Sequence, residues 1–452
     1  MIHGPLLFFI LLLSVGFIVV ATAKLKLHPF LSLLLASFGL GIAVGIPLQE
    51  VVKAVTEGFG GLMGYIGIVI VAGTIMGKIL EKSGAALRMA EVVLRIVGEK
   101  RPQIAMTLIG AIVSIPVFCD SGFVILSGLR KALARRAHVS LASMSVALAT
   151  GLYATHTLVP PTPGPIAAAG NIGAGDYLGT IILIGLVVSV PVALAGYLWA
   201  TKVASSIKIE GEEKPDYDYH EVVEAFGQLP SAAKAFTPIF LPIVLIGTGS
   251  VVSYAQWTGK PAEVLLFLGN PVVALLLGVF AAFPLLPKWN EETLTGWVGE
   301  GINDSAAILL LTGAGGAFGA VIKATPVADV IKSFAEGGSL TGALVLLIPF
   351  FVAAALKTAQ GSSTAALVIT SALVAPMLPQ AGIEGAVPLA LVVMAIGAGA
   401  MVVSHVNDSY FWVVTQFSGL KVSDAYKAHT MASLMQGIVA ILTTMLLWFL
   451  LI

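Results

Sequence analysis

Three ionisable residues, Asp120, Lys357 and Asp408, lie within long apolar stretches of this 452-residue sequence. A charge at the centre of a bilayer costs at least ~2.5–3.5 kcal/mol on insertion scales, so each of them needs a partner or a task. Either aspartate could carry a proton, although Asp120 could instead cap a helix that begins at Gly122. Lys357 could neutralise an anion, but we favour an ion pair with one aspartate, because an unpaired buried ammonium loses its proton.

Small hydroxyl-bearing residues surround two of these charges. Ser121 and Gly122 follow Asp120, and Ser362, Ser363 and Thr364 follow Lys357. Such residues at a helix start present free N–H groups and the positive end of the helix dipole, which is the chemistry of a carboxylate site. They could instead only permit close helix packing. Their occurrence in two corresponding places favours binding.

Two histidines add further polar groups. His156 lies between Thr155 and Thr157, and His405 lies 249 residues later, two residues before Asn407. These side chains could bind substrate hydroxyls or relay protons, or the histidines could simply be hydrogen-bonded within a helix bundle. Neither histidine has companions at metal-ligand spacing, so we expect no metal.

The composition places these residues in a membrane. The chain is 58% hydrophobic and 11% charged, with a mean hydropathy of +0.99. Its longest apolar runs approach or exceed the ~20 residues that cross a bilayer as a helix. These runs include 4–23, 178–200, 264–287 and 428–452. We therefore predict an all-α polytopic membrane protein. The zero net charge argues against nucleic-acid binding, and the single Cys119 excludes an internal disulfide.

Lys and Arg predict the orientation. With the N-terminus outside, 19 of these residues fall in inside segments and four in outside segments. The basic breaks at 81–102 and 130–138 then lie on one side, so the stretch 103–130 must be a re-entrant hairpin. A second hairpin is expected at 340–378, which breaks at 357–364 and enters from the opposite side.

Two distant stretches, 72–83 and 314–325, are similar to each other. Gly73 and Gly77 in the first match Gly315 and Gly319 in the second. The charge pattern makes these segments run in opposite directions, which predicts two inverted-topology repeats. At nearly the same offset, the hairpin tips align Asp120 with Gly361.

Each predicted repeat also has a transmembrane helix that breaks in its middle. One covers about 140–170 and breaks at 154–165, and the other covers about 385–418 and breaks at 403–412. Broken helices at membrane depth survive only where they are buried in protein or line a water-filled cavity. Two hairpin tips and two breaks therefore predict one shared central site.

The expected organisation follows directly. It comprises scaffold helices at 1–58, repeat 1 at 59–204, a cytoplasmic linker at 205–236, further scaffold helices at 237–300, repeat 2 at 301–420 and a C-terminal helix at 421–452.

Three strings carry a resemblance to a known family. GAIVSIPVFCDSGFVIL at 110–126, ATHTLVPPTPGPIAAAG at 154–170 and VVSHVNDSYFW at 402–412 resemble the gluconate permease family, within the ion transporter superfamily. The resemblance implies proton-coupled uptake of gluconate or a related sugar acid, or of D-serine in one branch. It also implies an elevator mechanism, a homodimer and a location in the cytoplasmic membrane. Sodium-coupled relatives carry Ser-Asn-Thr at both tips, and the absence of that Asn here agrees with proton coupling.

The sequence thus predicts a symporter that needs no cofactor beyond a proton gradient. The substrate carboxylate would lie between the tips, with its hydroxyls near Thr155, His156, Thr157 and Asn407. Alternatives are a carrier for another hydroxy carboxylate, a dicarboxylate or an amino acid. Lys357 as the only intramembrane cation argues for one carboxylate. An intramembrane enzyme or a channel is a further alternative, although no catalytic signature supports an enzyme.

Overall fold

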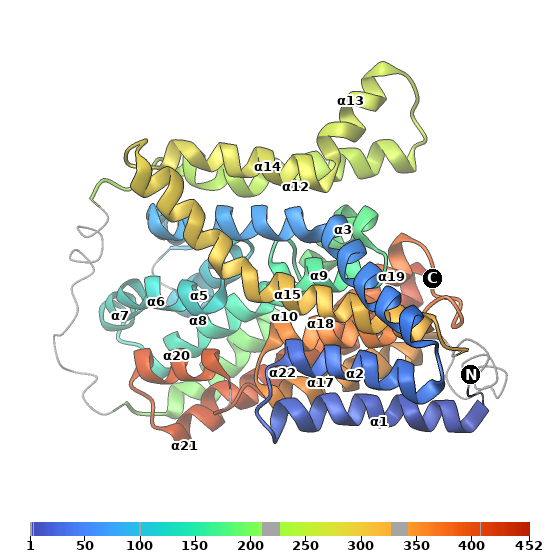
Figure 1. Ribbon diagram of the computed structural model, residues 1–452. Coiled ribbons are helices and arrows are strands. Elements are labelled where there is room, and N and C mark those ends of the chain that lie inside the picture. Colours follow the sequence, from blue (N-terminus) through green and yellow to red (C-terminus); the bar gives the residue numbers. More distant parts are fainter. Residues whose placement is uncertain (1, 3, 99–100, 210–226, 327–341, 407) are drawn as a thin grey trace.

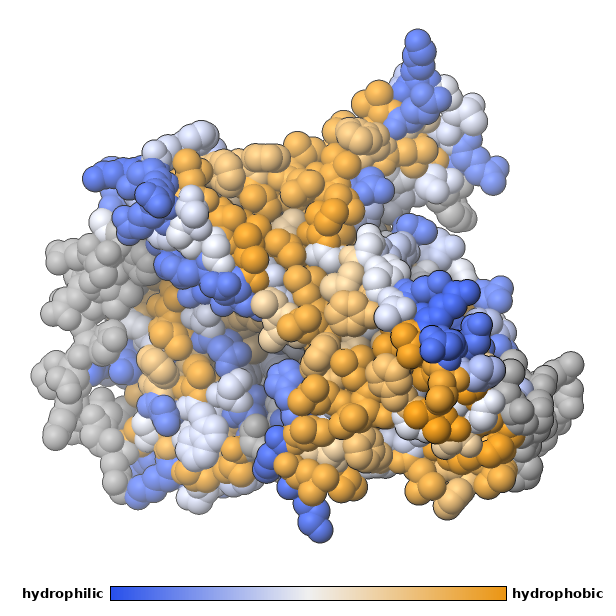
Figure 2. Space-filling model, in the orientation of Figure 1, coloured by the Kyte–Doolittle hydropathy of each residue, from blue (hydrophilic) through white to orange (hydrophobic). Residues whose placement is uncertain are grey.

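The computed structural model describes residues 2, 4–98, 101–209, 227–326, 342–406 and 408–452, and every regular element in these ranges is a helix (Figure 1). Six helices are long and apolar enough to cross a membrane, or seven if one bent pair is counted as a single span. Apolar side chains cover much of the outer surface (Figure 2), including that of α1 (Gly4–Ala23) and α12 (Ala232–Tyr254). The prediction of an all-helical polytopic membrane protein is confirmed.

Two long helices, α3 (Leu48–Lys82) and α15 (Val298–Lys323), cross and pack closely against each other (Figure 1). Their backbones approach because glycines lie at the crossing. A Cβ atom on Gly58 would lie 2.6 Å from the carbonyl oxygen of Gly316. Helices α2 (Pro29–Val44) and α14 (Pro271–Ala282) pack against this pair, and α13 (Lys260–Gly269) packs against α12 and α14.

Beside these helices lie four pairs of shorter helices, and a break in helical structure separates the two members of each pair (Figure 1). They are α5 (Pro102–Val113) with α6 (Cys119–Ile125), α8 (Leu141–His156) with α9 (Pro163–Asn171), α17 (Leu347–Gln360) with α18 (Ser363–Val374), and α19 (Ala386–Met401) with α20 (Ser409–Ser418). Helix α7 (Ser127–Arg136) extends the first pair. Helices α10 (Leu178–Lys202) and α22 (Met431–Leu451) pack against each other and against α8 and α19.

Each interruption has a local cause. Pro116 and the four prolines at 160–165 cannot donate the backbone hydrogen bonds that would continue a helix. Gly361 ends α17 in the left-handed conformation, with φ of 84°. Asp408 begins α20 as its N-cap, with its side chain accepting from the Tyr410 N–H. The breaks therefore occur at residue types that end or begin helices.

The matched glycines of 72–83 and 314–325 lie where α3 and α15 meet the interrupted helices. A Cβ on Gly77 would lie 2.4 Å from the Pro116 carbonyl oxygen, and one on Gly73 would lie 2.9 Å from that of Pro161. On α15, a Cβ on Gly315 would lie 3.3 Å from the Ala372 Cβ. Small residues here let the interrupted helices approach the α3–α15 pair.

Several expected boundaries are wrong. Residues 48–57, which fall at the end of the expected scaffold segment 1–58, form the first turns of α3, so this helix runs across the expected start of repeat 1 at residue 59. The expected loop at 130–138 is helical to Arg136. The apolar run 264–287 is not one straight span, since α13 and α14 meet at Asn270 with a bend of 66°.

The proposed linker and the second hairpin are only partly described. Residues 210–226 of the linker and 340–341 of the hairpin lie outside the described residues. The stretch 85–98 forms the amphipathic helix α4 (Ala85–Val97), whose apolar face packs on α5 and α12.

Candidate functional site

A buried ion pair joins the second hairpin to the second broken helix. The Lys357 Nζ lies 2.6 Å from the Asp408 Oδ2, and the two side chains are 0% and 5% exposed. The same ammonium donates to the Gly361 carbonyl oxygen at 2.5 Å. The predicted pairing of Lys357 is therefore with Asp408, across a break in each element.

The helices place both charges favourably. Lys357 lies in the last turn of α17, where the helix dipole is negative. Asp408 is the N-cap of α20, where the dipole is positive, and its Oδ1 accepts from the Tyr410 N–H at 3.1 Å. Each ion is thus stabilised by its own helix as well as by its partner, which offsets part of the cost of burial.

A histidine that the sequence did not point to extends this network. The Ser404 hydroxyl lies 2.5 Å from the Asp408 Oδ2 and 3.1 Å from the His429 Nε2. A serine hydroxyl has one proton, so if it donates to the carboxylate it must accept from the histidine. That leaves the buried His429 Nδ1 as an acceptor with no partner among the described residues. His429 escaped notice because it begins the last apolar run, far from the predicted breaks.

The tip of the first hairpin faces the same carboxylate. Asp120 is close enough to interact with the charge of Asp408 and with the side chain of Ser409. Its helix, α6, packs against α20. Asp120 is not the cap proposed for a helix beginning at Gly122, because α6 begins at Cys119 after Phe118. Its buried Oδ1 has no hydrogen-bond partner among the described residues.

The neighbours of Asp120 differ in role. Ser121 is half-buried at the tip. Gly122 packs against α8, where a Cβ would lie 2.7 Å from a methyl of Leu152. Gly122 therefore permits close helix packing, which was the alternative to binding. Because Gly122 lacks a side chain, the tip can lie against the first broken helix.

The second tip presents its hydroxyls in three directions. Ser362 is the N-cap of α18 and accepts from the Ala365 N–H at 3.1 Å. Ser363 is buried, and its hydroxyl lies 2.6 Å from that of Tyr153 on α8. Thr364 lies beside the break of the first broken helix, near Gly164. Tyr153 was not predicted, since one aromatic residue in an apolar run carries no distinct signal.

The three predicted residues of the first break are all buried, but their side chains differ in hydrogen bonding. Thr155 donates its hydroxyl to the Ala111 carbonyl oxygen at 2.8 Å, which joins α8 to α5. The His156 Nδ1 and the Thr157 hydroxyl are buried without partners among the described residues. His156 lies within electrostatic reach of Lys357 and Asp408. Unpaired buried polar atoms are rare in proteins and often mark a functional site.

The two histidines do not occupy equivalent positions. His156 ends α8, whereas His405 lies beyond Met401, which ends α19. The His405 Nε2 lies 2.9 Å from the Thr358 carbonyl oxygen, and the residue is half-buried. Asn407 lies outside the described residues.

The hairpin tips are likewise offset from the sequence alignment. Helix α6 begins at Cys119 and α18 at Ser363, so the helix starts pair Asp120 with Thr364 and not with Gly361. The alignment was displaced by three residues because the tips differ in length.

Arg130 is a second fully buried cation, in addition to Lys357. Arg130 is 0% exposed and donates to the hydroxyls of Ser145 and Ser418 and to the Phe417 carbonyl oxygen. It lies 4.9 Å from the Phe123 ring centre. Its partners lie on α8 and at the end of α20, so Arg130 holds three helices together. Charge counting had assigned it to a loop.

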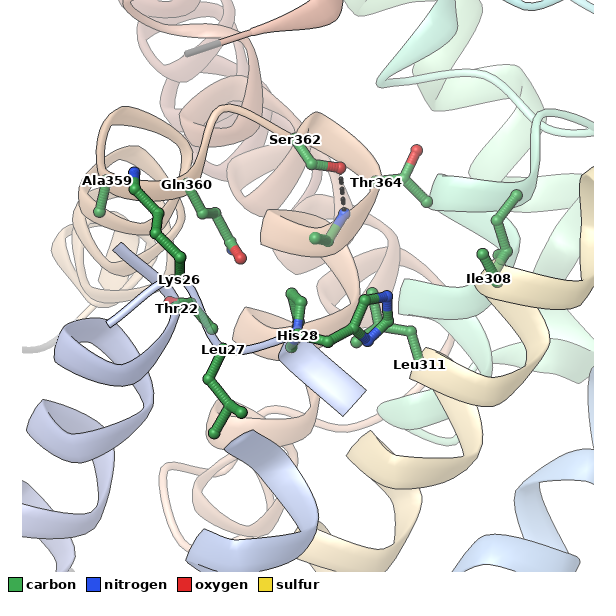
Figure 3. Close-up of a pocket in the computed structure, with 13 residues that line it drawn as sticks. Thr22, Lys26, Leu27, His28, Ile308, Leu311, Ala359, Gln360, Ser362 and Thr364 are labelled. Atoms are coloured by element: carbon green, nitrogen blue, oxygen red, sulfur yellow. Dashed lines mark hydrogen bonds between the residues drawn. The ribbon is translucent and has the colours of Figure 1, made fainter. Parts of the chain in front are cut away.

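A cavity of about 600 Å³ opens beside the second tip (Figure 3). Gln360, Ser362 and Thr364 line it on the hairpin side, and the turn between α1 and α2 lines it opposite. Gly361, between two of these lining residues, accepts the hydrogen bond from Lys357. One peptide unit thus separates the ion pair from the cavity wall.

Comparison with known proteins finds relatives among permeases and transporters. A family model described as GntP family permease matches residues 6–451. A gluconate permease of Pseudomonas aeruginosa is 32% identical over 99% of this chain and 98% of its own length. The D-serine transporter DsdX of Escherichia coli is 33% identical over 97% of each chain.

Solved structures share the fold at lower identity. MtrF of Neisseria gonorrhoeae, described within a class of antimetabolite efflux pumps, has a TM-score of 0.68 at 17% identity and covers 96% of this chain and 97% of its own. The YdaH transporter of Alcanivorax borkumensis has a TM-score of 0.66 at 14% identity, with coverage of 92% and 97%. The protein is therefore a multi-pass membrane transporter and not an enzyme. By its sequence over almost the whole length, the chain belongs to the GntP permease family.

Proposed function

We propose that this protein imports gluconate or a related sugar acid together with a proton across the cytoplasmic membrane. The observation that carries the proposal is the Lys357–Asp408 ion pair, buried one peptide unit from a cavity that the polar side chains of the second tip help to line. The similarity to gluconate permeases supports the substrate class. The N-terminus is proposed to lie outside and the 205–236 linker inside, and a homodimer is the proposed assembly.

The ion pair offers a simple way to couple the two solutes. A proton that neutralises Asp408 removes the attraction that holds the Lys357 ammonium. The ammonium can then attract the substrate carboxylate through the tip of the second hairpin. Without substrate, Lys357 returns to the ionised Asp408. Asp120, close to Asp408 on the opposite hairpin, is the alternative proton carrier.

Alternating access is proposed to follow from two inverted repeats. The α3–α15 pair would hold still while the hairpins and broken helices move past it as an elevator. The matched glycines support this division, because they give α3 and α15 small-residue surfaces against the hairpins and the first break.

D-serine is a second candidate, because a D-serine transporter is as similar as the gluconate permeases. The cavity favours gluconate. D-serine carries an ammonium that needs an acceptor, and no Asp or Glu is among the described residues lining the cavity. Gluconate brings one carboxylate and several hydroxyls, which suit Ser362, Thr364 and the Gln360 amide.

Uptake by proteoliposomes with an imposed pH gradient tests both candidates. We expect accumulation of labelled gluconate against its gradient when the outside is acidic, and collapse of that accumulation when a protonophore is added. Gluconate should compete better than D-serine. Only downhill equilibration would indicate a channel, and accumulation unaffected by the protonophore would refute proton coupling.

A further inference from the structure

We propose that Lys26 and His28, on the turn between α1 and α2, form an anion-binding subsite with the tip of the second hairpin. This subsite would receive the carboxylate of the substrate at the face of the protein where that turn lies. The inference rests on the proposed transport of a carboxylate and adds a contribution from a turn outside the hairpins and broken helices.

The geometry brings two distant segments to one cavity. Figure 3 shows Lys26 beside Ala359 and Gln360. It shows His28 on the opposite side of the same cavity from Ser362 and Thr364. The turn precedes α2, whereas the tip joins α17 to α18, so more than 330 residues separate them in sequence. The cavity's volume of about 600 Å³ suits a ligand the size of a sugar acid.

The charge of the cavity selects for anions. Its described lining includes one lysine and one histidine and no acidic residue. A larger cavity of about 800 Å³ lies beside the C-terminal end of α15 and provides a contrast, since Glu57, Glu384 and Lys323 all line it. Of these two cavities, only the one beside the second tip therefore has an uncompensated positive lining.

The turn holds a histidine ring and a lysine at the cavity. The His28 Nδ1 accepts from the Phe30 N–H at 3.3 Å and caps α2. A neutral ring with Nδ1 as acceptor carries its proton on Nε2, which is then available to a carboxylate. Lys26 has a φ of 58°, an uncommon backbone conformation for a lysine. The structure therefore keeps a costly local conformation at the residue that brings the charge to the cavity.

The opposite wall has unused polar groups. Both the amide oxygen and the amide nitrogen of Gln360 are buried and lack a hydrogen-bond partner among the described residues. A buried amide left unpaired is unfavourable, so a ligand that forms its hydrogen bonds gains affinity. The Ser362 side chain caps α18, and the free N–H groups of that helix start add to the anion preference.

The test compares Lys26→Gln with Lys24→Gln. Lys24 is an exposed cation on the same turn that does not line the cavity. We expect Lys26→Gln to raise KM for gluconate by roughly three- to tenfold with little change in kcat, as for one hydrogen bond lost by an exposed side chain. The effect should appear for substrate presented at the face of the turn and should shrink at high salt. Lys24→Gln should match the wild type.

A second variant examines the histidine without removing the cap. His28→Asn keeps a side chain that can cap α2 but removes the ring from the cavity. We expect a higher KM, with unchanged elution of the purified protein on size exclusion. Equal KM values for Lys26→Gln and Lys24→Gln would overturn the subsite, whatever His28→Asn does.

Direct binding separates this inference from the proposed function. Labelled gluconate and D-serine are titrated onto the purified full-length protein by scintillation proximity. If the wild type binds gluconate and Lys26→Gln does not weaken it, the subsite is wrong and the transport proposal stands. If the wild type binds only D-serine, the choice of gluconate fails. A Lys26→Gln effect on D-serine would then still support the subsite, and its absence would refute it.

Discussion

Lys357 and Asp408 depend on each other because neither can reach water. Removing one partner of a buried pair leaves an uncompensated charge, typically at a cost of about 3–5 kcal/mol. We expect Lys357→Met alone to lower the yield of folded protein sharply, because Asp408 then remains buried and unpaired. The double variant Lys357→Met/Asp408→Leu should recover much of that yield. Fluorescence-detected size exclusion measures the yield.

Transport should not recover with folding. The double variant lacks the groups proposed to exchange a proton for a carboxylate, so we expect no proton-driven accumulation. A double variant that still concentrates gluconate would show that the pair is only structural.

The two aspartates can be distinguished by amide substitution. Asp408→Asn keeps a good N-cap for α20 while removing the charge, and Asp120→Asn removes the charge from the first tip. If Asp120 carries the proton, Asp120→Asn stays folded but loses uphill uptake while retaining exchange of internal for external substrate. Unchanged accumulation of labelled gluconate in this variant would exclude Asp120 as the carrier.

At the scale of elements, α3 depends on close approach to the first hairpin. A Cβ on Gly77 would lie 2.4 Å from a backbone oxygen of Pro116, so Gly77→Ala must push the hairpin away. We expect the uptake rate to fall at least about tenfold, because small displacements at a packed site have large effects on rate. The control is Gly64→Ala on the same helix, where nothing lies within 4 Å of the new Cβ. Initial rates in proteoliposomes test this expectation, and equal rates for both variants would contradict it.

The positions of the helix breaks could be predicted from the sequence. The positions 115–123, 154–165, 357–364 and 403–412 all contain helix ends, because Pro, Gly and capping residues act locally. The register between the tips and the equivalence of His156 and His405 were wrong, because both depend on helix starts that differ by a few residues between the halves.

For the whole molecule, the proposed elevator requires hairpin 2 to slide past α15. A Cβ on Gly315 would lie 3.3 Å from the Ala372 Cβ, close to the spacing of a disulfide. In a Cys119→Ser background, oxidation of Gly315→Cys/Ala372→Cys should stop uptake, and reductant should restore it.

The matched control is a disulfide between cysteines placed on α3 and α15, the two helices that pack together through glycines such as Gly58 and Gly316. Both helices are proposed to hold still, so this cross-link should leave uptake largely intact. Uptake that survives the first cross-link would argue against movement between α15 and the hairpin.

The sequence alone determined that this protein is a helical membrane transporter of its family, since hydropathy, helix-breaking residues and family strings are local properties of the chain. It also pointed to Asp120, Lys357 and Asp408, because charges in apolar segments stand out. Only the tertiary structure decided which aspartate pairs with Lys357, joined His429 to that pair through Ser404, and buried Arg130. It also brought Lys26 to the second tip. These contacts join residues on separate elements, and their distances depend on how helices pack, which no local pattern records.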